Sequence, residues 1–127
     1  MSADKVKDYL RAMEERDLER AKNYLAPDFK MTFPGGRTMT SLDELIAWSK
    51  GRYKSVTKTF EDFDVFEAGD QTVVYNTGML NGEALDGSPI REVRYIDRFV
   101  FRDGLIVDQQ VWNDLADVLP KTAAASS

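Results

Sequence analysis

A carboxyl group in an unusual setting is the first sign of chemistry in this sequence. Asp97 lies in an alternating segment, with Tyr95 and Phe99 two positions away on either side. Residues two apart share one face of a strand, so Asp97 is expected to face the core. Loss of hydration there should raise its pKa and hold it as a neutral hydrogen-bond donor to a ligand carbonyl. Alternatively, Asp97 is structural and pairs with Arg91, Arg94 or a backbone amide. Both interpretations stay open.

The residue types available for other chemistries are few, because the 127 residues include no Cys and no His. This excludes disulfides, thiolate nucleophiles, Ser-His-Asp triads and zinc sites built from Cys or His. With 17 basic and 22 acidic side chains, the net charge of −5 disfavours nucleic acids and anionic membranes as partners. The glycines after Pro34 lack the spacing of a nucleotide-binding loop. We therefore expect neither a metal nor another cofactor.

The length and the 43% of hydrophobic residues predict one domain over residues 4–119. Residues 120–127 carry no large apolar side chain and are predicted to be a disordered tail. The N-terminus lacks the apolar segment of a signal peptide, and no apolar run is long enough to span a membrane. We therefore expect a cytoplasmic protein.

Helical signals dominate the first part of the chain. Apolar residues at helical spacing predict a helix that buries Val6, Tyr9, Leu10 and Met13. Asp17 is expected to cap a second, short helix that ends at Ala26-Pro27. A short strand follows over residues 28–33. A capping box at Ser41-Leu42-Asp43-Glu44 predicts a third helix over residues 41–53.

After Lys54 the pattern changes to the two-residue period of strands, and three or four strands are expected. Turns are predicted at residues 69–70, 81–87 and 103–104. The clearest strand covers residues 91–102, and its partner covers 105–114. The alternation slips at residues 61–63, which predicts a bulge and a bent sheet. The pattern indicates an α+β fold, in which three N-terminal helices cover a curved antiparallel or mixed sheet that encloses a pocket.

Two segments resemble the nuclear transport factor 2-like superfamily, which includes ketosteroid isomerases, SnoaL-like polyketide cyclases and limonene-epoxide hydrolases. Residues 95–106 resemble its penultimate strand, turn and last strand, and Ile96-Asp97-x-Phe99-x-Phe101 is similar to the isomerase motif with a protonated oxyanion-hole aspartate. Residues 9–13, followed by Arg16-Asp17-Leu18 and Pro34, are also similar to those isomerases. The resemblance covers about residues 4 to 118 and implies the cone-shaped fold of that superfamily.

The resemblance also implies roles for individual residues. It places Tyr9 as the second oxyanion-hole donor, although a Tyr at helical spacing is also typical of a core. It places Phe33 where the isomerases carry their general base, and Phe cannot accept a proton, so steroid isomerisation is disfavoured. Trp112-Asn113-Asp114 is similar to the strand end that carries a catalytic aspartate in cyclases and epoxide hydrolases. Asp114 is therefore a catalytic candidate, or else it caps the turn at residues 115–119.

Epoxide hydrolysis is disfavoured, because residues 74–79 contain neither the Arg nor the Asp that this activity uses. Strand alternation puts Gln109, Val111 and Asn113 on one face, and the resemblance turns that face inward beside Asp97. We expect a ligand pocket lined by Phe33, Trp48, Tyr95, Phe99, Phe101, Gln109, Val111 and Asn113.

Two functional hypotheses follow. The first is a cofactor-independent SnoaL-like enzyme of the isomerase, cyclase, lyase or hydrolase type, which acts on a small hydrophobic carbonyl or phenol through Asp97, Tyr9 and Asp114. The second is a non-catalytic ligand-binding or dimerisation domain on the same scaffold, which Phe33 supports. The resemblance also implies a homodimer through the outer sheet face, where we place Ile96, Val100 and Trp112.

Overall fold

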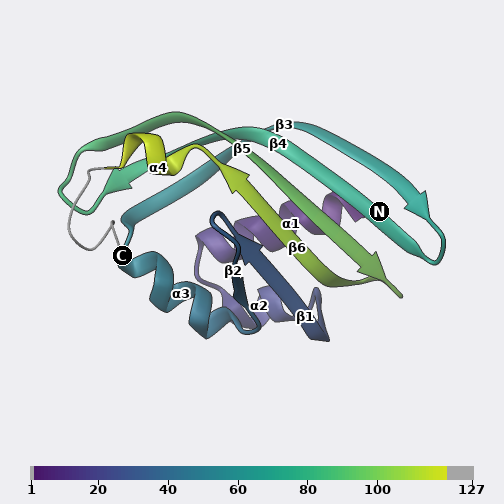
Figure 1. Cartoon of the computed structure of the whole chain (residues 1–127). Coiled ribbons are helices and arrows are strands. Elements are labelled where there is room, and N and C mark those ends of the chain that lie inside the picture. Colours follow the sequence, from purple (N-terminus) through teal and green to yellow (C-terminus); the bar gives the residue numbers. More distant parts are fainter. Residues whose placement is uncertain (1, 120–127) are drawn as a thin grey trace.

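The computed structural model describes residues 2–119, which form four helices and six strands in one mixed sheet. The strand order is β2-β1-β6-β5-β4-β3, with β1 parallel to β6 and every other neighbouring pair antiparallel. The elements are α1 (Ser2–Glu14), α2 (Leu18–Lys22), β1 (Leu25–Phe33), β2 (Arg37–Met39), α3 (Leu42–Lys50), β3 (Tyr53–Ala68), β4 (Gln71–Ala84), β5 (Pro89–Arg102), β6 (Leu105–Asn113) and α4 (Leu115–Val118). The long strands arch over the N-terminal helices (Figure 1). This is the predicted α+β architecture.

The helices start where the capping residues predict. The Asp17 side chain accepts a hydrogen bond from the backbone N–H of Arg20 at the start of α2. At the start of α3, the Ser41 hydroxyl accepts from the N–H of Glu44 at 3.2 Å, and the Glu44 carboxylate accepts in return from the N–H of Thr40 at 3.1 Å. The bonds from the N–H groups of Arg20 and Glu44 satisfy backbone donors that a helix leaves free at its first turn, and the bond from Thr40 ties the preceding residue to α3.

The chain between α2 and α3 differs from the prediction. The second helix ends at Lys22, and Ala26-Pro27 lies within β1 rather than stopping a helix. The reason is tertiary: Leu25 pairs with Ile106 of β6, whose N–H donates to the carbonyl of Tyr24 at 2.8 Å. The strand β2, which pairs with the end of β1, has no signal in the sequence. The third helix ends at Lys50, before the predicted residue 53.

The predicted bulge in β3 is confirmed, because the pairing of β3 with β4 shifts between Phe60 and Asp62. The predicted turn at residues 81–87 is shorter than expected. Asn81 and Gly82 belong to β4, and the connection to β5 begins only after Ala84. Position 82 needs a glycine, because a β-carbon there would stand 2.0 Å from the carbonyl oxygen of Ser55. This glycine therefore serves close strand contact rather than a turn.

The inward face of β5 is the one that alternation predicts. Asp97 pairs with Asn76 of β4 on one side and with Val111 of β6 on the other. All the residues on this face are at least 97% buried: Val93, Tyr95, Asp97, Phe99 and Phe101. The main core joins the inner side of α1, including Val6 and Tyr9, to the middle of the sheet. Asp97 thus lies in the layer between helix and sheet.

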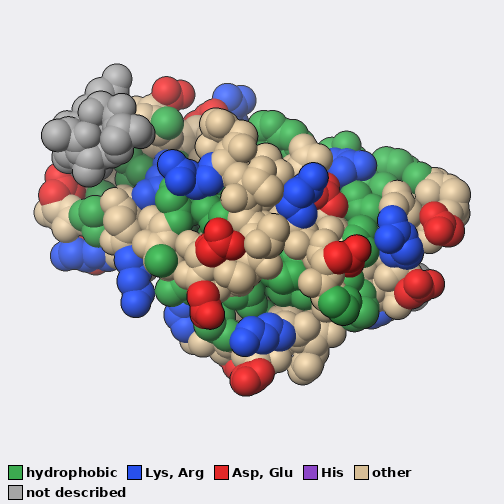
Figure 2. All heavy atoms as spheres, turned by 60° about the horizontal axis from the view of Figure 1, so that its bottom comes forward, with side chains coloured by type: hydrophobic (Ala, Val, Ile, Leu, Met, Phe, Trp, Pro, Cys, Tyr) green, Lys and Arg blue, Asp and Glu red, His purple; other side chains and the backbone are tan. Residues whose placement is uncertain are grey.

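The surface in Figure 2 carries basic and acidic side chains interspersed with hydrophobic ones. Within the part of the chain that the structure describes, no helix has both the length and the apolar character that a membrane span needs. The predicted tail at residues 120–127 lies outside the described residues.

Candidate active site around Asp97

Asp97 is completely buried, and neither of its carboxylate oxygens accepts a hydrogen bond from the described residues. Arg91 and Arg94, the predicted alternative partners, do not pair with it. The cation beside it is Lys58 of β3, whose Nζ lies 3.6 Å from Oδ2. This distance makes an ion pair that is longer than a hydrogen bond. Burial raises the pKa of Asp97, and the Lys58 charge opposes this shift without cancelling it.

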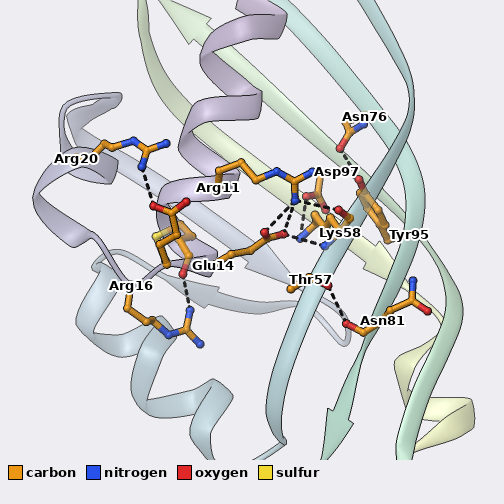
Figure 3. A network of polar contacts seen from close by, with 12 residues as sticks. Arg11, Glu14, Arg16, Arg20, Thr57, Lys58, Asn76, Asn81, Tyr95 and Asp97 are labelled. Carbon is orange, nitrogen blue, oxygen red and sulfur yellow. Dashed lines mark hydrogen bonds and ion pairs between the residues drawn. The ribbon is translucent and has the colours of Figure 1, made fainter.

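The Lys58 side chain is 20% exposed, and its ammonium also lies 5.0 Å from the centre of the Tyr95 ring. Two side chains of α1 bind its backbone. Glu14 Oε2 accepts from the Lys58 N–H at 2.8 Å, and Arg11 Nη1 donates to the Lys58 carbonyl at 3.0 Å. Arg11 and Glu14 also form an ion pair at 2.9 Å. Figure 3 shows these groups converging between α1 and the sheet.

Tyr9 comes from the inner side of α1 and is 99% buried. Its ring packs edge-on against Phe99, with ring centres 6.0 Å apart. Its hydroxyl donates to Gln109 Oε1 at 3.4 Å and lies 4.0 Å from the sulfur of Met31. Burial and, to a lesser degree, the charge of Asp97 raise the pKa of Tyr9, so that it stays a neutral donor.

Tyr95 is held firmly beside Asp97. Its hydroxyl donates to Asn76 Oδ1 at 2.6 Å, and Asn76 Nδ2 donates to the carbonyls of Asp62 and Thr77. Burial raises the pKa of Tyr95, with a smaller contribution from Asp97. Tyr95 and Asn76 are therefore uncharged, hydrogen-bonded neighbours of Asp97.

Asp114, the third catalytic candidate, lies in a different environment. Its carboxylate accepts from Arg94 Nε at 2.8 Å, and its side chain is 41% exposed. It is the N-cap residue of α4, but its side chain makes no capping bond. Asn113 does this instead, because its Oδ1 accepts from the N–H of Leu115 at 3.1 Å.

The predicted pocket residues fall into several groups. Phe99 and Phe101 are buried in the main core with Tyr9, while Phe33 and Trp48 pack at its edge with ring centres 5.0 Å apart. Gln109 and Val111 are also buried. Tyr95 belongs to a second cluster with Leu80, Ala84, Ile90, Val93 and Leu115. Asn113 is engaged in capping α4.

Two open hollows mark the surface, and Asp97 lines neither of them. One, of about 570 Å³, lies between α1 and β3 and includes Arg11 and Phe60. The other, of about 610 Å³, includes Ile96, Trp112 and the Arg94–Asp114 pair. The first adjoins Lys58, because Arg11 binds the Lys58 backbone and its guanidinium lies 4.1 Å from the Phe60 ring centre.

Lys58 is the site residue that sequence reasoning missed. It precedes the β3 bulge, where the alternation slips, and nothing in its sequence neighbourhood indicates a buried cation. Its partner is 39 positions away and two strands across in the sheet. The sequence shows only a lysine between Thr57 and Thr59 in an alternating segment. This pattern is equally typical of a strand edge exposed to solvent.

Comparisons with known proteins agree with this architecture. The family described as the SnoaL-like domain matches residues 6–109. Solved structures with the same fold include an NTF2-like protein of unknown function from Burkholderia pseudomallei K96243, 24% identical, with a TM-score of 0.70 and coverage of 91% of this chain and 92% of that one. No curated protein sequence matches this chain significantly.

Two further structures show the same fold. TerC, co-crystallized with polyporic acid, is 19% identical with a TM-score of 0.72, and the match covers 91% of this chain and 92% of that chain. The CaMKII hub of S. rosetta is 19% identical with a TM-score of 0.71, covering 89% and 94%. The chain therefore belongs to the SnoaL-like domain family, and it shares its fold with NTF2-like proteins.

Proposed function

We propose that this protein is a small-molecule enzyme of the SnoaL-like type, which acts on a hydrophobic ligand with a carbonyl or phenol oxygen through Asp97 and Tyr9. The observation that carries the proposal is the state of Asp97: it is fully buried, and its oxygens are without hydrogen-bond partners among the described residues. Burying a carboxyl group without hydrogen bonds lowers the free energy of unfolding, and a hydrogen bond with a ligand oxygen would offset this loss.

The chemistry rests on the raised pKa of Asp97. A carboxyl group that holds its proton at higher pH can donate a hydrogen bond to a carbonyl oxygen, or exchange a proton with the ligand. Tyr9 packs on Phe99, two positions from Asp97, and its hydrogen bond to Gln109 is long at 3.4 Å. Tyr9 can exchange this bond for one to the ligand.

The proposal is tested by ligand binding and turnover on a panel of enones, polyketide-like phenols and polyporic acid, which TerC was crystallized with. We expect one of these classes to be turned over, and Asp97→Asn to lower the rate by about 100-fold, as removal of an oxyanion donor typically does. The matched control is Asp64→Asn, an exposed carboxylate on β3. Asp114→Asn tests the third predicted catalytic residue. Absence of binding by the wild type to every compound would overturn the proposal.

A second candidate function is ligand binding without catalysis. The observation that favours it is Phe33, whose ring packs against Trp48 where the sequence resemblance places a general base. Tight binding of a panel compound that is not consumed would support this function over the enzyme.

We also propose that two copies associate through the outer face of the sheet. Ile96 and Trp112 are cross-strand neighbours there, and they are 42% and 48% exposed. Val100, the third residue predicted for this interface, is only 5% exposed in the single chain and offers little surface. The interface would therefore centre on Ile96 and Trp112.

A further inference from the structure

Two arginines lie against one tryptophan at the end of α3. The guanidinium carbon of Arg52 is 4.5 Å from the centre of the Trp48 ring, and that of Arg37 is 5.8 Å from it. Phe33 packs on the same indole, with ring centres 5.0 Å apart. Arg52 and Trp48 are partly buried, while Arg37 is exposed. These four side chains, the Arg37–Arg52 cluster, therefore lie where a ligand can reach them from solvent.

One tight turn and one helix end bring the cluster together. The N–H of Gly36 donates to the carbonyl of Phe33 at 3.0 Å, and this turn makes Phe33 and Arg37 cross-strand partners in β1 and β2. Trp48 lies in the last turn of α3, and Arg52 follows the helix after one more residue. Since α3 packs against β2, the side chains of the hairpin and of the helix end meet.

The Arg37–Arg52 cluster holds two positive charges and no acidic side chain. Carboxylates are in excess in this chain, with 22 acidic against 17 basic residues. Four other arginines form ion pairs with them: Arg11, Arg20, Arg94 and Arg98. Within residues 2–119, neither Arg37 nor Arg52 has such a partner. Burial lowers the pKa of Arg52, and the charge of Arg37 contributes to this shift. The two guanidinium groups are thus close enough to repel each other.

The rest of the chain explains only part of this arrangement. Stacking of a guanidinium group on an indole is favourable. The C-terminal end of a helix also attracts cations, because its carbonyls carry about half a unit of negative charge. Arg52 benefits from both effects, but Arg37 belongs to β2, and half a charge does not balance two guanidinium groups. The cluster therefore keeps an excess of positive charge.

A phosphate group matches this cluster in shape and in charge. The N–H groups of a guanidinium project from its edges in one plane, so stacking on Trp48 leaves them free to form parallel hydrogen bonds with an oxyanion. A phosphate monoester carries a charge of about −1.5 to −2 at pH 7, which balances two arginines, whereas a carboxylate balances one. The exposed Arg37 side chain can adjust to the ligand, while the partly buried Arg52 is held against the indole.

We propose that Arg37 and Arg52, packed on Trp48, bind the phosphate group of a small phosphate monoester. The site lies between the β1–β2 hairpin and the end of α3, and it uses neither Asp97 nor Tyr9. It therefore goes beyond the proposed function, and either can fail while the other holds.

Trp48 reports directly on this site, because it contacts both guanidinium groups and only one other tryptophan, Trp112, is present. In Trp112→Phe at constant ionic strength, we expect inorganic phosphate and phenyl phosphate to change the Trp48 fluorescence in a saturable way. Calorimetry of the wild type should give the same Kd. Arg52→Gln should weaken binding by about 10- to 100-fold, as loss of a charge-assisted hydrogen bond does. Arg37→Gln should weaken it by about 3- to 10-fold, because the exposed charge is screened.

Arg102→Gln is the matched control, since Arg102 is exposed at the end of β5 and forms no ion pair within the described part of the chain. It removes the same charge and should leave the Kd unchanged. Arg52→Lys keeps the charge but not the planar donors, so it should bind more tightly than Arg52→Gln and more weakly than the wild type. Benzoate, which has the ring of phenyl phosphate but one negative charge, should bind about 10-fold more weakly.

Absence of a saturable signal with both phosphates, together with no heat of binding in the wild type, would overturn the proposal. Equal losses in Arg102→Gln and in the two cluster variants would overturn it as well, because phosphate would then respond to net charge alone. Benzoate bound as tightly as phenyl phosphate would exclude a dianion as the preferred ligand. Because Arg52→Gln also removes packing on Trp48, its thermal midpoint is measured; if it unfolds, the exposed Arg37→Gln decides between these outcomes.

Discussion

Few interactions stabilise the ionised form of the Asp97 carboxyl group. It is fully buried, and one ammonium at 3.6 Å offsets only part of the lost hydration, so its pKa is raised. Asp8 shows the opposite case on the same protein. Hydrogen bonds from Arg20 and Tyr24 lower its pKa to about 2, and its ion pair with Arg20 links α1 to α2. The two environments thus shift the pKa of the two carboxyl groups in opposite directions.

The raised pKa of Asp97 predicts a pH-dependent stability. Between about pH 3.9, where an unfolded Asp titrates, and the raised value, the folded state binds a proton that the unfolded state does not, so stability falls as pH rises. Asp97→Asn removes this loss, since the partly exposed Lys58 can regain water. We expect Asp97→Asn to be more stable at pH 8 by about 1.4 kcal/mol for each unit of the shift, and equal to wild type near pH 3.5.

Urea denaturation of the two proteins across this pH range measures the difference. Asp64→Asn, which changes an exposed carboxylate, should follow the wild-type curve at every pH. A constant gap between Asp97→Asn and wild type from pH 3.5 to 8 would contradict a raised pKa.

The inward position of Asp97 could be predicted from sequence, because strand alternation and its aromatic neighbours assign it to the core face. The same alternation puts Arg94 on the opposite face, where it binds Asp114. Lys58 could not be predicted as its partner, because that contact depends on the register of three strands. It also depends on the bulge after Phe60, which the sequence locates only roughly.

At the scale of elements, the contact between β3 and β4 leaves no space for a side chain at two glycines of β4. Gly78 faces Phe60 just before the register shift, and Gly82 faces Val56 near the shift at Tyr53–Ser55. A β-carbon on Gly78 would stand 2.0 Å from the Thr59 carbonyl oxygen and 3.0 Å from the Tyr95 hydroxyl. Gly78 therefore permits both the strand contact and the position of the Tyr95 ring beside Lys58.

Gly78→Ala is accordingly expected to destabilise the fold by about 1–3 kcal/mol, as overpacking of a buried position does. It should also weaken ligand binding, because the added methyl group displaces Tyr95. Gly51→Ala is the control, since its β-carbon would make an ordinary contact of 3.6 Å with the Trp48 carbonyl oxygen in a helical conformation. Urea midpoints at pH 7 provide the comparison. Equal losses for the two variants would show that the strand contact is not the cause.

At the scale of the whole molecule, the two faces of the sheet differ in what covers them. The helices bury the inner face with Tyr95, Asp97 and Phe99, as the alternating polarity of the strands predicts. On the outer face, Trp112 and Ile96 lie together on neighbouring strands with nearly half of each side chain exposed. The layer order follows from local patterns. The parallel pairing of β1 with β6 does not, because it joins segments that are distant in the sequence, and β1 has only a weak strand signal.

The exposed pair on the outer face gives the last prediction. If this face joins two copies, sedimentation should show wild-type protein as a dimer and Trp112→Glu as a monomer, because each copy would bury a carboxylate against apolar surface. Val118→Glu is the matched control, since Val118 is 52% exposed and belongs to α4 rather than to either of the two strands. It should leave the mass unchanged. The same mass for wild type and Trp112→Glu would exclude this face as the interface. Retained binding of a panel compound in a Trp112→Glu monomer would show that the proposed Asp97 site is complete within one chain.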